Sequence, residues 1–332
     1  MDDSSLGREI EVIKSLDAKV TDALGFLTDP EKLWYPSDFL PDVSREDWHD
    51  QIKEFRTRAK SVRLPILAVL IGNTLTEEAL PAYMSWLNRI EHVKDKTGAE
   101  THPWAIWTRR WTAEEDRHGV LLAGYLALNP NVDLPAMQRS QYDLIAAGFD
   151  FHAGASPYNV LVYTSFQERA TRVSHQNTGI VAGKDGDIVL EKICLKIGGD
   201  EARHEMFYKS MMRHAFDADP NGAMLAFARM MKEQIRMPAE SLRGRNGTNL
   251  YDVFSQIAQA EGVYTARDYV EIMRELIKFW SIENRTGLAP EAQQAQEYLM
   301  SLPRKYERLA ARMEANKRPA QMEQVPWVRR AV

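Results

Sequence analysis

Two Glu-x-x-His pairs, each inside a stretch of helical periodicity, limit the folds open to this chain more than any other feature. They are Glu115 with His118 and Glu201 with His204. Because residues three apart lie on one face of an α-helix, each pair can direct a carboxylate and an imidazole at one metal ion. Oxygen and nitrogen ligands without a thiolate favour iron or manganese over a structural zinc site. Two such pairs predict two metal ions held between helices.

The spacing alone is a weak signal. A third pair, Glu46 with His49, arises by chance among the eight histidines, and we interpret it as a surface feature near the start of a helix. The other two pairs share stripes with apolar and aromatic residues, including Trp111 beside the first and Tyr208 beside the second. Charged groups on an inward helical face are unfavourable unless they are paired or bound to a metal. The inward pairs are therefore the candidate ligands.

A two-metal site in a helix bundle also needs one carboxylate from each of two further helices. Glu77 and Glu168 each lie on the apolar stripe of a separate predicted helix. Either residue alone would be an ordinary salt-bridged glutamate. With the two pairs they complete a set of six candidate ligands: Glu77, Glu115, His118, Glu168, Glu201 and His204.

Apolar residues recur at three- and four-residue spacing through most of the chain, and Gly and Pro cluster between the periodic segments. The pattern predicts an all-α fold, with a ferritin-like di-iron four-helix bundle core and additional helices. We expect helices over residues 44–62, 65–91, 103–127, 133–147, 157–180, 187–215, 220–235, 249–260, 264–286 and 289–315. All 332 residues should form one domain, with the bundle core at about 65–215, extra helices at about 220–315 and an extended tail at 317–332.

Composition and charge exclude several classes of protein. The longest uncharged apolar stretch, 64–72, is far shorter than the roughly 20 residues of a membrane-spanning helix, so we expect no membrane span. A net charge of −5 argues against nucleic acid as a partner. The acidic amino terminus resembles neither a secretory signal nor a transit peptide, and the single Cys194 fits a reducing compartment. We expect a cytoplasmic protein, or a plastid stromal one if the chain is a mature form.

Around the candidate ligands the chain resembles the soluble plant-type acyl-acyl-carrier-protein desaturases, the stearoyl-acyl-carrier-protein desaturase family. The matching segments are TEEALPAY at 76–83, WAIWTRRWTAEEDRHG at 104–119, TSFQERAT at 164–171 and DEARHE at 200–205. Carried over position by position, the iron ligands of the family fall on the same six residues. The resemblance implies two iron ions per chain and an enzyme of fatty acid biosynthesis. It would use dioxygen to introduce a cis double bond into a saturated acyl chain on acyl carrier protein.

The resemblance also implies roles for residues that are not ligands. Thr171 would be a catalytic residue beside the oxygen-binding face. Trp34, Asp200 and His118 would form a path for electrons, and a carboxylate such as Asp200 commonly holds the second ring nitrogen of a metal-bound histidine. Ferredoxin would be the electron donor, and the protein would be a homodimer.

Three residues are candidates for the wall of the acyl slot: Trp86, Arg89 and Val160. Their bulk favours a shorter or differently placed acyl chain, whereas ordinary packing and surface charge are the alternative interpretation. The basic run at 56–63 is a candidate docking face for an acidic carrier protein. Gly198 and Gly199, which precede the second pair, either loosen their helix or make room for a neighbour.

Two other protein classes use similar ligands. A ferroxidase or iron-storage protein could hold the same six residues, but a minimal ferritin-like bundle is much shorter than this chain. A ribonucleotide reductase small subunit would need a radical tyrosine, for which Tyr208 and Tyr125 are candidates. The long matching segments favour the desaturase over both.

Overall fold

The computed structural model describes residues 3–244, 247–315 and 322–329. Within these ranges the chain is helical, and its only strand-like pairings are two isolated bridges, Val132 with Val328 and Arg243 with Asn249. The all-α prediction is therefore confirmed.

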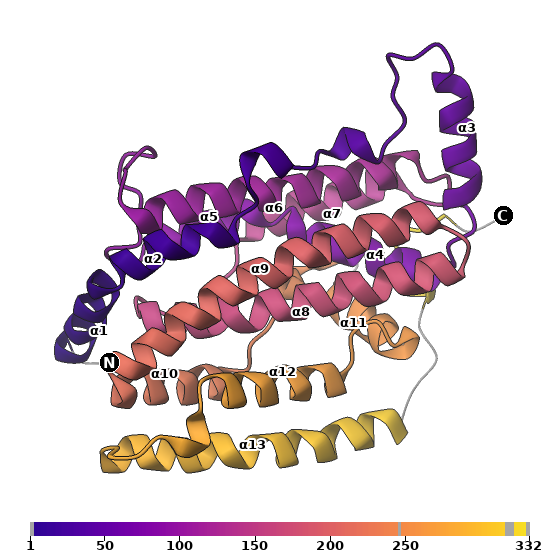
Figure 1. Cartoon of the computed structure of the whole chain (residues 1–332). Helices are drawn as coiled ribbons and strands as arrows, with labels where there is room; N and C mark the ends of the chain where they lie inside the picture. Colours follow the sequence, from indigo (N-terminus) through magenta and orange to yellow (C-terminus); the bar gives the residue numbers. More distant parts are fainter. Residues whose placement is uncertain (1–2, 245–246, 316–321, 330–332) are drawn as a thin grey trace.

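Four helices form the central bundle: α4 (Leu64–Glu77), α6 (Pro103–Leu128), α8 (Pro157–Lys184) and α9 (Ile188–Ala218). Helix α4 contacts α6 and α8, and α9 contacts the same two, which closes the ring. The contact between α8 and α9 is the most extensive, and the two run side by side through the centre of Figure 1. Large apolar side chains from all four helices are buried in the core.

The remaining helices surround this bundle. They are α1 (Asp3–Ser15), α2 (Asp17–Ala23), α3 (Trp48–Ala59), α5 (Leu80–Leu87), α7 (Leu134–Ala147), α10 (Pro220–Glu233), α11 (Leu250–Glu261), α12 (Ala266–Phe279) and α13 (Pro290–Ala315). Helices α10 and α12 pack on α8, and α13 packs on both of them as an outer layer (Figure 1). Helix α11 packs on α4. No helix in the described part of the chain combines the length and apolar character needed to cross a bilayer.

Most predicted helices agree with the structure to within a few residues, but the one expected at 65–91 is divided. Helix α4 ends at Glu77 and α5 begins at Leu80. Pro81 explains the break, because it has no N–H to donate to the Glu77 carbonyl and its ring clashes with that carbonyl in a continuous helix. One candidate ligand thus stands at the end of its helix.

Side-chain caps fix where the ligand-bearing helices α8 and α9 begin. The Ser156 hydroxyl accepts a hydrogen bond from the Asn159 N–H at 3.1 Å, directly before Pro157. The Asp187 carboxylate accepts bonds from the N–H groups of Val189 and Leu190. Such caps satisfy amide groups that would otherwise lack partners at a helix start. They therefore help to set the positions of the ligands farther along each helix.

Residues 322–329 of the predicted tail lie against α7. The Trp327 indole N–H donates to the Ser140 hydroxyl at 2.8 Å, and the Arg329 N–H donates to the Asn131 carbonyl at 2.7 Å. The remaining residues of the predicted tail lie outside the described ranges. Near the other end of the sequence, Glu46 and His49 are both exposed, as the surface interpretation of that pair predicts.

Candidate metal centre

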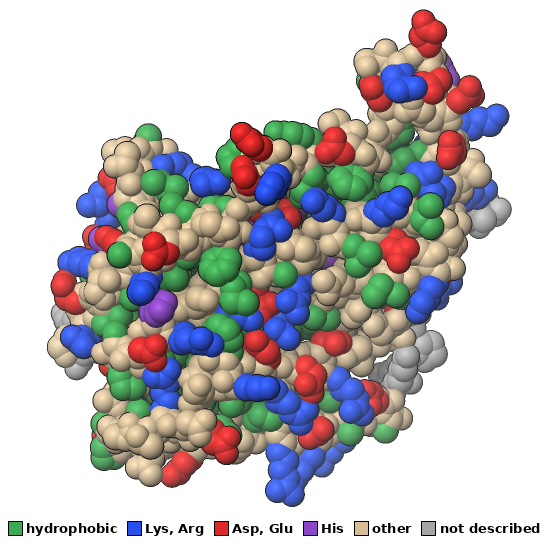
Figure 2. Space-filling model, in the orientation of Figure 1, with side chains coloured by type: hydrophobic (Ala, Val, Ile, Leu, Met, Phe, Trp, Pro, Cys, Tyr) green, Lys and Arg blue, Asp and Glu red, His purple; other side chains and the backbone are tan. Residues whose placement is uncertain are grey.

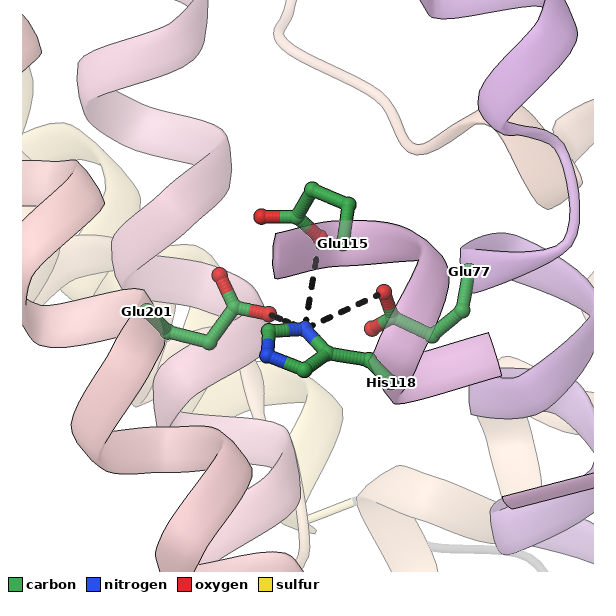
Figure 3. Close-up of side chains that lie close together, drawn as sticks. All are labelled: Glu77, Glu115, His118 and Glu201. Atoms are coloured by element: carbon green, nitrogen blue, oxygen red, sulfur yellow. Dashed lines mark ion pairs between the residues drawn. The ribbon is translucent and has the colours of Figure 1, made fainter. Parts of the chain in front are cut away.

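The bundle brings the six candidate ligands together in two overlapping clusters. Four of them, Glu77, Glu115, His118 and Glu201, place ligand atoms within 4.8 Å of one another (Figure 3). Glu115, Glu168, Glu201 and His204 form a second group by the same measure. The four helices α4, α6, α8 and α9 each contribute at least one of these residues.

Two carboxylates belong to both clusters. Glu115 places one oxygen 3.4 Å from His118 Nδ1 and the other 2.7 Å from His204 Nδ1. Glu201 belongs to both clusters as well. Each cluster also has one carboxylate and one histidine that the other lacks. These are Glu77 and His118 in the first cluster and Glu168 and His204 in the second. This arrangement would allow two metal ions to be held, with Glu115 and Glu201 within reach of both.

The donor atoms of the clusters fit such a pair of ions. All six residues are buried, and both oxygens of Glu168 and Glu201 lack a hydrogen-bond partner among the described residues, as does Nδ1 of His118. Buried polar atoms are rarely left without a partner. Four buried carboxylates also need positive charge, and two divalent cations would balance them. The donor set of oxygen and imidazole nitrogen is suited to iron.

The outer ring nitrogens of the two histidines are held by carboxylates from the opposite helix. Asp200 on α9 lies 3.3 Å from Nε2 of His118 on α6, and Glu114 on α6 lies 3.0 Å from Nε2 of His204 on α9. Such partners fix the orientation of a metal-bound imidazole. The sequence prediction named Asp200 but missed Glu114. A signal existed, because an acid directly precedes the Glu of both Glu-x-x-His motifs.

An arginine directly precedes the histidine in both motifs as well. Arg117 lies 3.4 Å from Asp200, while Arg203 contacts Asp200 at 2.7 Å and Glu114 at 3.5 Å. The two arginines thus offset the charge of the carboxylates that hold the histidines. The side chain of Arg203 is one-third exposed, so it links both histidine partners to the protein surface.

Burial and neighbouring charges shift the pKa values of the centre in opposite directions. Burial raises the pKa of the Glu168 and Glu201 carboxyl groups, and the neighbouring Glu115 charge raises them further. Burial alone would lower the pKa of His204, but the surrounding carboxylates outweigh it and hold that pKa well above its ordinary value. Burial also acts to raise the pKa of Glu114, yet the bond to His204 outweighs it and lowers this pKa to about 2. The bond between Glu114 and His204 is therefore charge-assisted.

The three residues of the predicted electron path are in contact. The Trp34 indole N–H donates to Asp200 Oδ2 at 2.9 Å, and the same oxygen lies 3.3 Å from His118 Nε2. The Trp34 ring is also parallel to the His118 ring, with centroids 6.0 Å apart. Two hydrogen bonds through Asp200 thus link Trp34 to His118, one histidine of the centre.

A cavity of about 500 Å³ reaches the centre from the surface between α4, α8, α11, α12 and α13. Glu77, Thr171 and His175 line its inner end, where His175 Nε2 lies 2.7 Å from Glu77. The Thr171 hydroxyl donates to the Glu168 carbonyl at 3.0 Å. The lining is mainly apolar and aromatic, and its volume lies in the range of about 300–1,000 Å³ typical of small-molecule sites.

The other predicted residues lie outside this lining. Trp86 is buried with its ring centroid 4.3 Å from that of Phe151, and Arg89 is exposed just after α5. Val160 borders a separate residual space of about 10 Å³ together with Tyr208. Tyr125, the other tyrosine considered for a radical, instead donates its hydroxyl to Asp187 at 2.7 Å.

The structure decides between the two interpretations of the paired glycines. A Cβ at Gly198 would lie 2.8 Å from Gln176 Cγ on α8, whereas a Cβ at Gly199 would meet nothing within 4 Å. Helix α9 continues through both positions. Gly198 therefore makes room for its neighbour, and Gly199 does not.

Sequence comparison places this chain among fatty acid desaturases, in agreement with the paired carboxylate and histidine clusters. The sequence profile described as fatty acid desaturase matches residues 8–329. A stearoyl-acyl-carrier-protein 9-desaturase of Gossypium hirsutum is 47% identical over 305 residues, which is 92% of this chain and 77% of that protein. Its counterpart from Ricinus communis is 44% identical over 322 residues, 97% of this chain and 81% of that protein. Both are named as chloroplastic.

The fold is shared with a solved structure as well. The X-ray structure of DesA2 from Mycobacterium tuberculosis H37Rv aligns with a TM-score of 0.55 at 19% identity, and the alignment covers 86% of this chain and 99% of that one. The resemblance found in the motifs is thus confirmed over nearly the whole sequence, and this chain belongs to the acyl-acyl-carrier-protein desaturase family of fatty acid desaturases.

Proposed function

We propose that this protein introduces a cis double bond into a saturated acyl chain carried on acyl carrier protein, as an oxygen-dependent step of fatty acid biosynthesis. One observation carries the proposal: two buried clusters share Glu115 and Glu201, and Glu77 of one cluster lines a largely apolar cavity that opens to the surface. A saturated chain has no polar handle, so a narrow apolar cavity is the means by which a protein can orient it.

We propose that the cofactor is two iron ions per chain. Glu77 and His118 would serve one ion, Glu168 and His204 the other, and Glu115 and Glu201 both. When bound, the pair supplies the reduction of dioxygen that drives removal of two hydrogens from the acyl chain. The balanced reaction joins those two hydrogens, two protons and two electrons with one dioxygen, and releases two waters.

The residues around the centre position the reactants and carry electrons inward. Ferredoxin would deliver the two electrons one at a time, and the chain from Trp34 through Asp200 to His118 supports that side as the point of entry. Thr171 presents its side chain at the inner end of the cavity, one helical turn from Glu168. We assign it a catalytic role in handling protons beside the site of oxygen reduction.

Substrate length would be limited where Trp86 and Val160 lie. Beyond the centre the residual space is about 10 Å³, and Val160 borders it. Trp86 packs against Phe151 and Tyr163 in the same region. We therefore favour an acyl chain with a short segment beyond the new double bond. Arg89 is exposed, so its side chain is the weakest of the three candidates for the slot wall.

The assembly and location of the protein extend this proposal. Ile180 on α8 and Leu195 on α9 are large apolar side chains at the surface, and we propose that this face joins two copies in a homodimer. The whole chain would act as one catalytic domain, since α11, α12 and α13 help to line the cavity. Its compartment must supply acyl carrier protein and ferredoxin, which the cytoplasm or the plastid stroma does.

The test is turnover with a defined set of substrates. The iron-loaded protein is reduced without oxygen, then exposed to oxygen with ferredoxin and acyl carrier proteins bearing chains of several lengths. Mass spectrometry should find a product two mass units lighter and locate its double bond. A protein that binds two irons but leaves every acyl chain saturated, or hydroxylates it, would contradict the proposal.

The alternatives predict different signals. Iron storage would give uptake far beyond two ions per chain, and a reductase subunit would give a stable tyrosyl radical on oxidation. Tyr208 is the tyrosine to watch, because its hydroxyl is buried without a partner in the described structure and its ring centroid lies 6.3 Å from that of Trp111, beside the centre. If the protein is a desaturase, its oxidised form should show no tyrosyl radical signal. Changing Tyr208 to Phe should then leave that spectrum unchanged.

A further inference from the structure

The two carboxylate oxygens of Glu77 face in different directions. Oε2 lies 3.8 Å from Nδ1 of His118, and Figure 3 shows the side chain extending from its helix toward that ring. Oε1 instead lies 2.7 Å from Nε2 of His175 on α8. Because a carboxylate accepts hydrogen bonds and does not donate them, Nε2 of His175 is the donor. One oxygen of this candidate ligand is thus held from outside the two clusters.

The contact between His175 and Glu77 is buried. Acidic and basic side chains are interspersed over the surface that Figure 2 shows, where water screens each charge. The side chains of His175 and Glu77, in contrast, are only 1% and 5% exposed. The other ring nitrogen of His175, Nδ1, has no hydrogen-bond partner among the described residues. Glu77 is therefore the one hydrogen-bond partner that the described structure gives this imidazole.

The other candidate ligands have supports that Glu77 lacks. Asp200 and Glu114 hold the outer ring nitrogens of the two histidines. The remaining three glutamates lie inside the continuous helices α6, α8 and α9. Glu77 is the last residue of α4, so no further helical turn follows it. A side chain from another helix is therefore needed to fix its orientation, and His175 is placed to do so.

A second polar contact joins the same two helices without touching a ligand. One turn before Glu77, the Asn73 amide oxygen accepts a hydrogen bond from the Ser174 hydroxyl at 3.0 Å. The Asn73 amide N–H donates to the Thr178 hydroxyl at 3.4 Å, and Thr178 is fully buried. This contact holds α4 against α8, whereas the bond from His175 ends on the ligand itself. The packing of the helices and the orientation of the ligand can thus be tested separately.

We infer that His175 is a positioning residue of the metal centre: its imidazole holds Oε1 of Glu77 and so keeps Oε2 facing the cluster of His118. This inference rests on the proposed two-metal centre. The arrangement is the reverse of the one at Asp200, where a carboxylate holds an imidazole. In both cases a hydrogen bond from outside the cluster fixes the orientation of a metal ligand.

The experiment measures the binding of Co²⁺ to the metal-free protein, so it requires neither dioxygen nor turnover. His175→Phe keeps a flat ring but removes the N–H, whereas the amide of His175→Gln can place an N–H near the same point. The matched control is Thr178→Val, which has nearly the same shape and removes the acceptor that Asn73 uses between the same two helices. Thermal midpoints verify that each variant is folded.

We expect the unmodified protein to bind two Co²⁺ ions, one at each cluster. His175→Phe should lower the affinity for one ion roughly 10- to 100-fold and change the visible absorption of that ion, while the other ion is bound as before. His175→Gln should recover most of the lost affinity. Thr178→Val should bind both ions as the unmodified protein does.

A double-mutant cycle tests whether His175 acts through Glu77. Glu77→Ala removes the carboxylate that His175 holds, so adding His175→Phe should cause no further loss of affinity. A further loss as large as that seen with Glu77 present would overturn the inference. So would an equal weakening of both ions in His175→Phe, or an equal loss in Thr178→Val.

Failure of the positioning role can be told apart from failure of the proposed function. If the unmodified protein does not bind two ions, the centre itself is refuted, and the role of His175 is refuted with it. If His175→Phe weakens one ion as expected but the iron-loaded protein leaves every acyl chain saturated, the desaturase function is refuted and the positioning role stands.

Discussion

Glu114 and Asp200 have the same task on opposite helices, since each holds the outer nitrogen of a histidine that faces the metal centre. Their carboxylates are themselves neutralised by arginines from the two motifs. Two five-residue segments, 114–118 and 200–204, therefore each supply one Glu-x-x-His pair of the centre and the carboxylate that holds the histidine of the other pair.

Changing Glu114 to Gln should weaken iron binding on the His204 side. The amide keeps the size of the side chain but removes the charge that orients and polarises the imidazole. Loss of such a partner typically lowers metal affinity 10- to 100-fold. An iron titration followed by spectroscopy should show one weakened site and one unchanged site. Glu46→Gln, at the exposed third pair, is the control, and equal affinity in the two variants would contradict the expectation.

Changing Trp34 to Phe should slow reduction by ferredoxin while leaving the iron content intact. The phenyl ring can still pack beside His118, but it loses the N–H donated to Asp200 at 2.9 Å. Stopped-flow reduction with ferredoxin measures the effect. Reduction by dithionite, which needs no docking site, serves as the reference. A ferredoxin rate equal to that of the unmodified protein would exclude Trp34 from the path.

At the scale of elements, glycines govern how closely the helices approach. Gly72 on α4 faces the ring of Phe254 on α11, and a Cβ there would overlap that ring. In contrast, a Cβ added at Gly199 on α9 would meet nothing within 4 Å. Both positions lie inside helices, where Gly is about 1 kcal/mol less favourable than Ala.

The two glycines should therefore respond to alanine in opposite directions. Gly199→Ala should stabilise the protein by about 0.5–1 kcal/mol through helix propensity. Gly72→Ala should destabilise it by about 1–3 kcal/mol, because the rigid Phe254 ring must move. Thermal or urea unfolding of both variants gives the comparison. If both variants changed the free energy of unfolding by the same amount and in the same direction, the close approach of α11 to α4 would not contribute to stability.

Periodicity predicted most of the helices and the inward faces of the ligands, because both depend on neighbours three and four residues apart. It missed α1 and α2, whose apolar side chains, such as Ile13 and Val20, are buried only by packing on the rest of the molecule. It also joined α4 to α5, since the apolar pattern continues past Pro81. Local sequence pattern thus predicts a helix and its inward face, whereas helices that depend on tertiary packing are not predicted by it.

Some features of the site had no local signal at all. Glu205, the residue after His204, is fully buried and binds Arg169, Arg172 and Lys209 between α8 and α9. These partners are far apart in the sequence or look like ordinary surface charges. Only the packed structure shows that this network joins the two helices directly beside their ligands.

For the whole molecule, the centre should contribute strongly to stability. Without metal, the buried oxygens of Glu168 and Glu201 have no hydrogen-bond partner in the described structure, and burial with the neighbouring Glu115 charge raises the pKa of both groups. Binding to the folded state alone stabilises it by roughly 2.7 kcal/mol when free metal is 100 times the dissociation constant. Calorimetry of the chelated and the iron-loaded protein should therefore show a lower midpoint after iron removal.

The control for this experiment is a variant that cannot bridge two ions. Glu115→Gln with Glu201→Gln removes both shared carboxylates and half of the buried negative charge. Its midpoint should be insensitive to iron, and higher than that of the chelated unmodified protein. A midpoint of the unmodified protein that does not change on chelation would show that the clusters do not bind metal tightly.

The end of α4 at Glu77 sets one ligand apart from the other five, which all lie inside continuous helices. Neighbouring turns on both sides fix the backbone under those five. Glu77 is followed by the joint at Glu78 and Ala79, it contacts His175, and it faces the cavity. Five of the six candidate ligands thus stand on continuous helical backbone, and the sixth stands at a helix end that faces the cavity. Under the proposed function, an acyl chain in the cavity would meet Glu77 before any other candidate ligand.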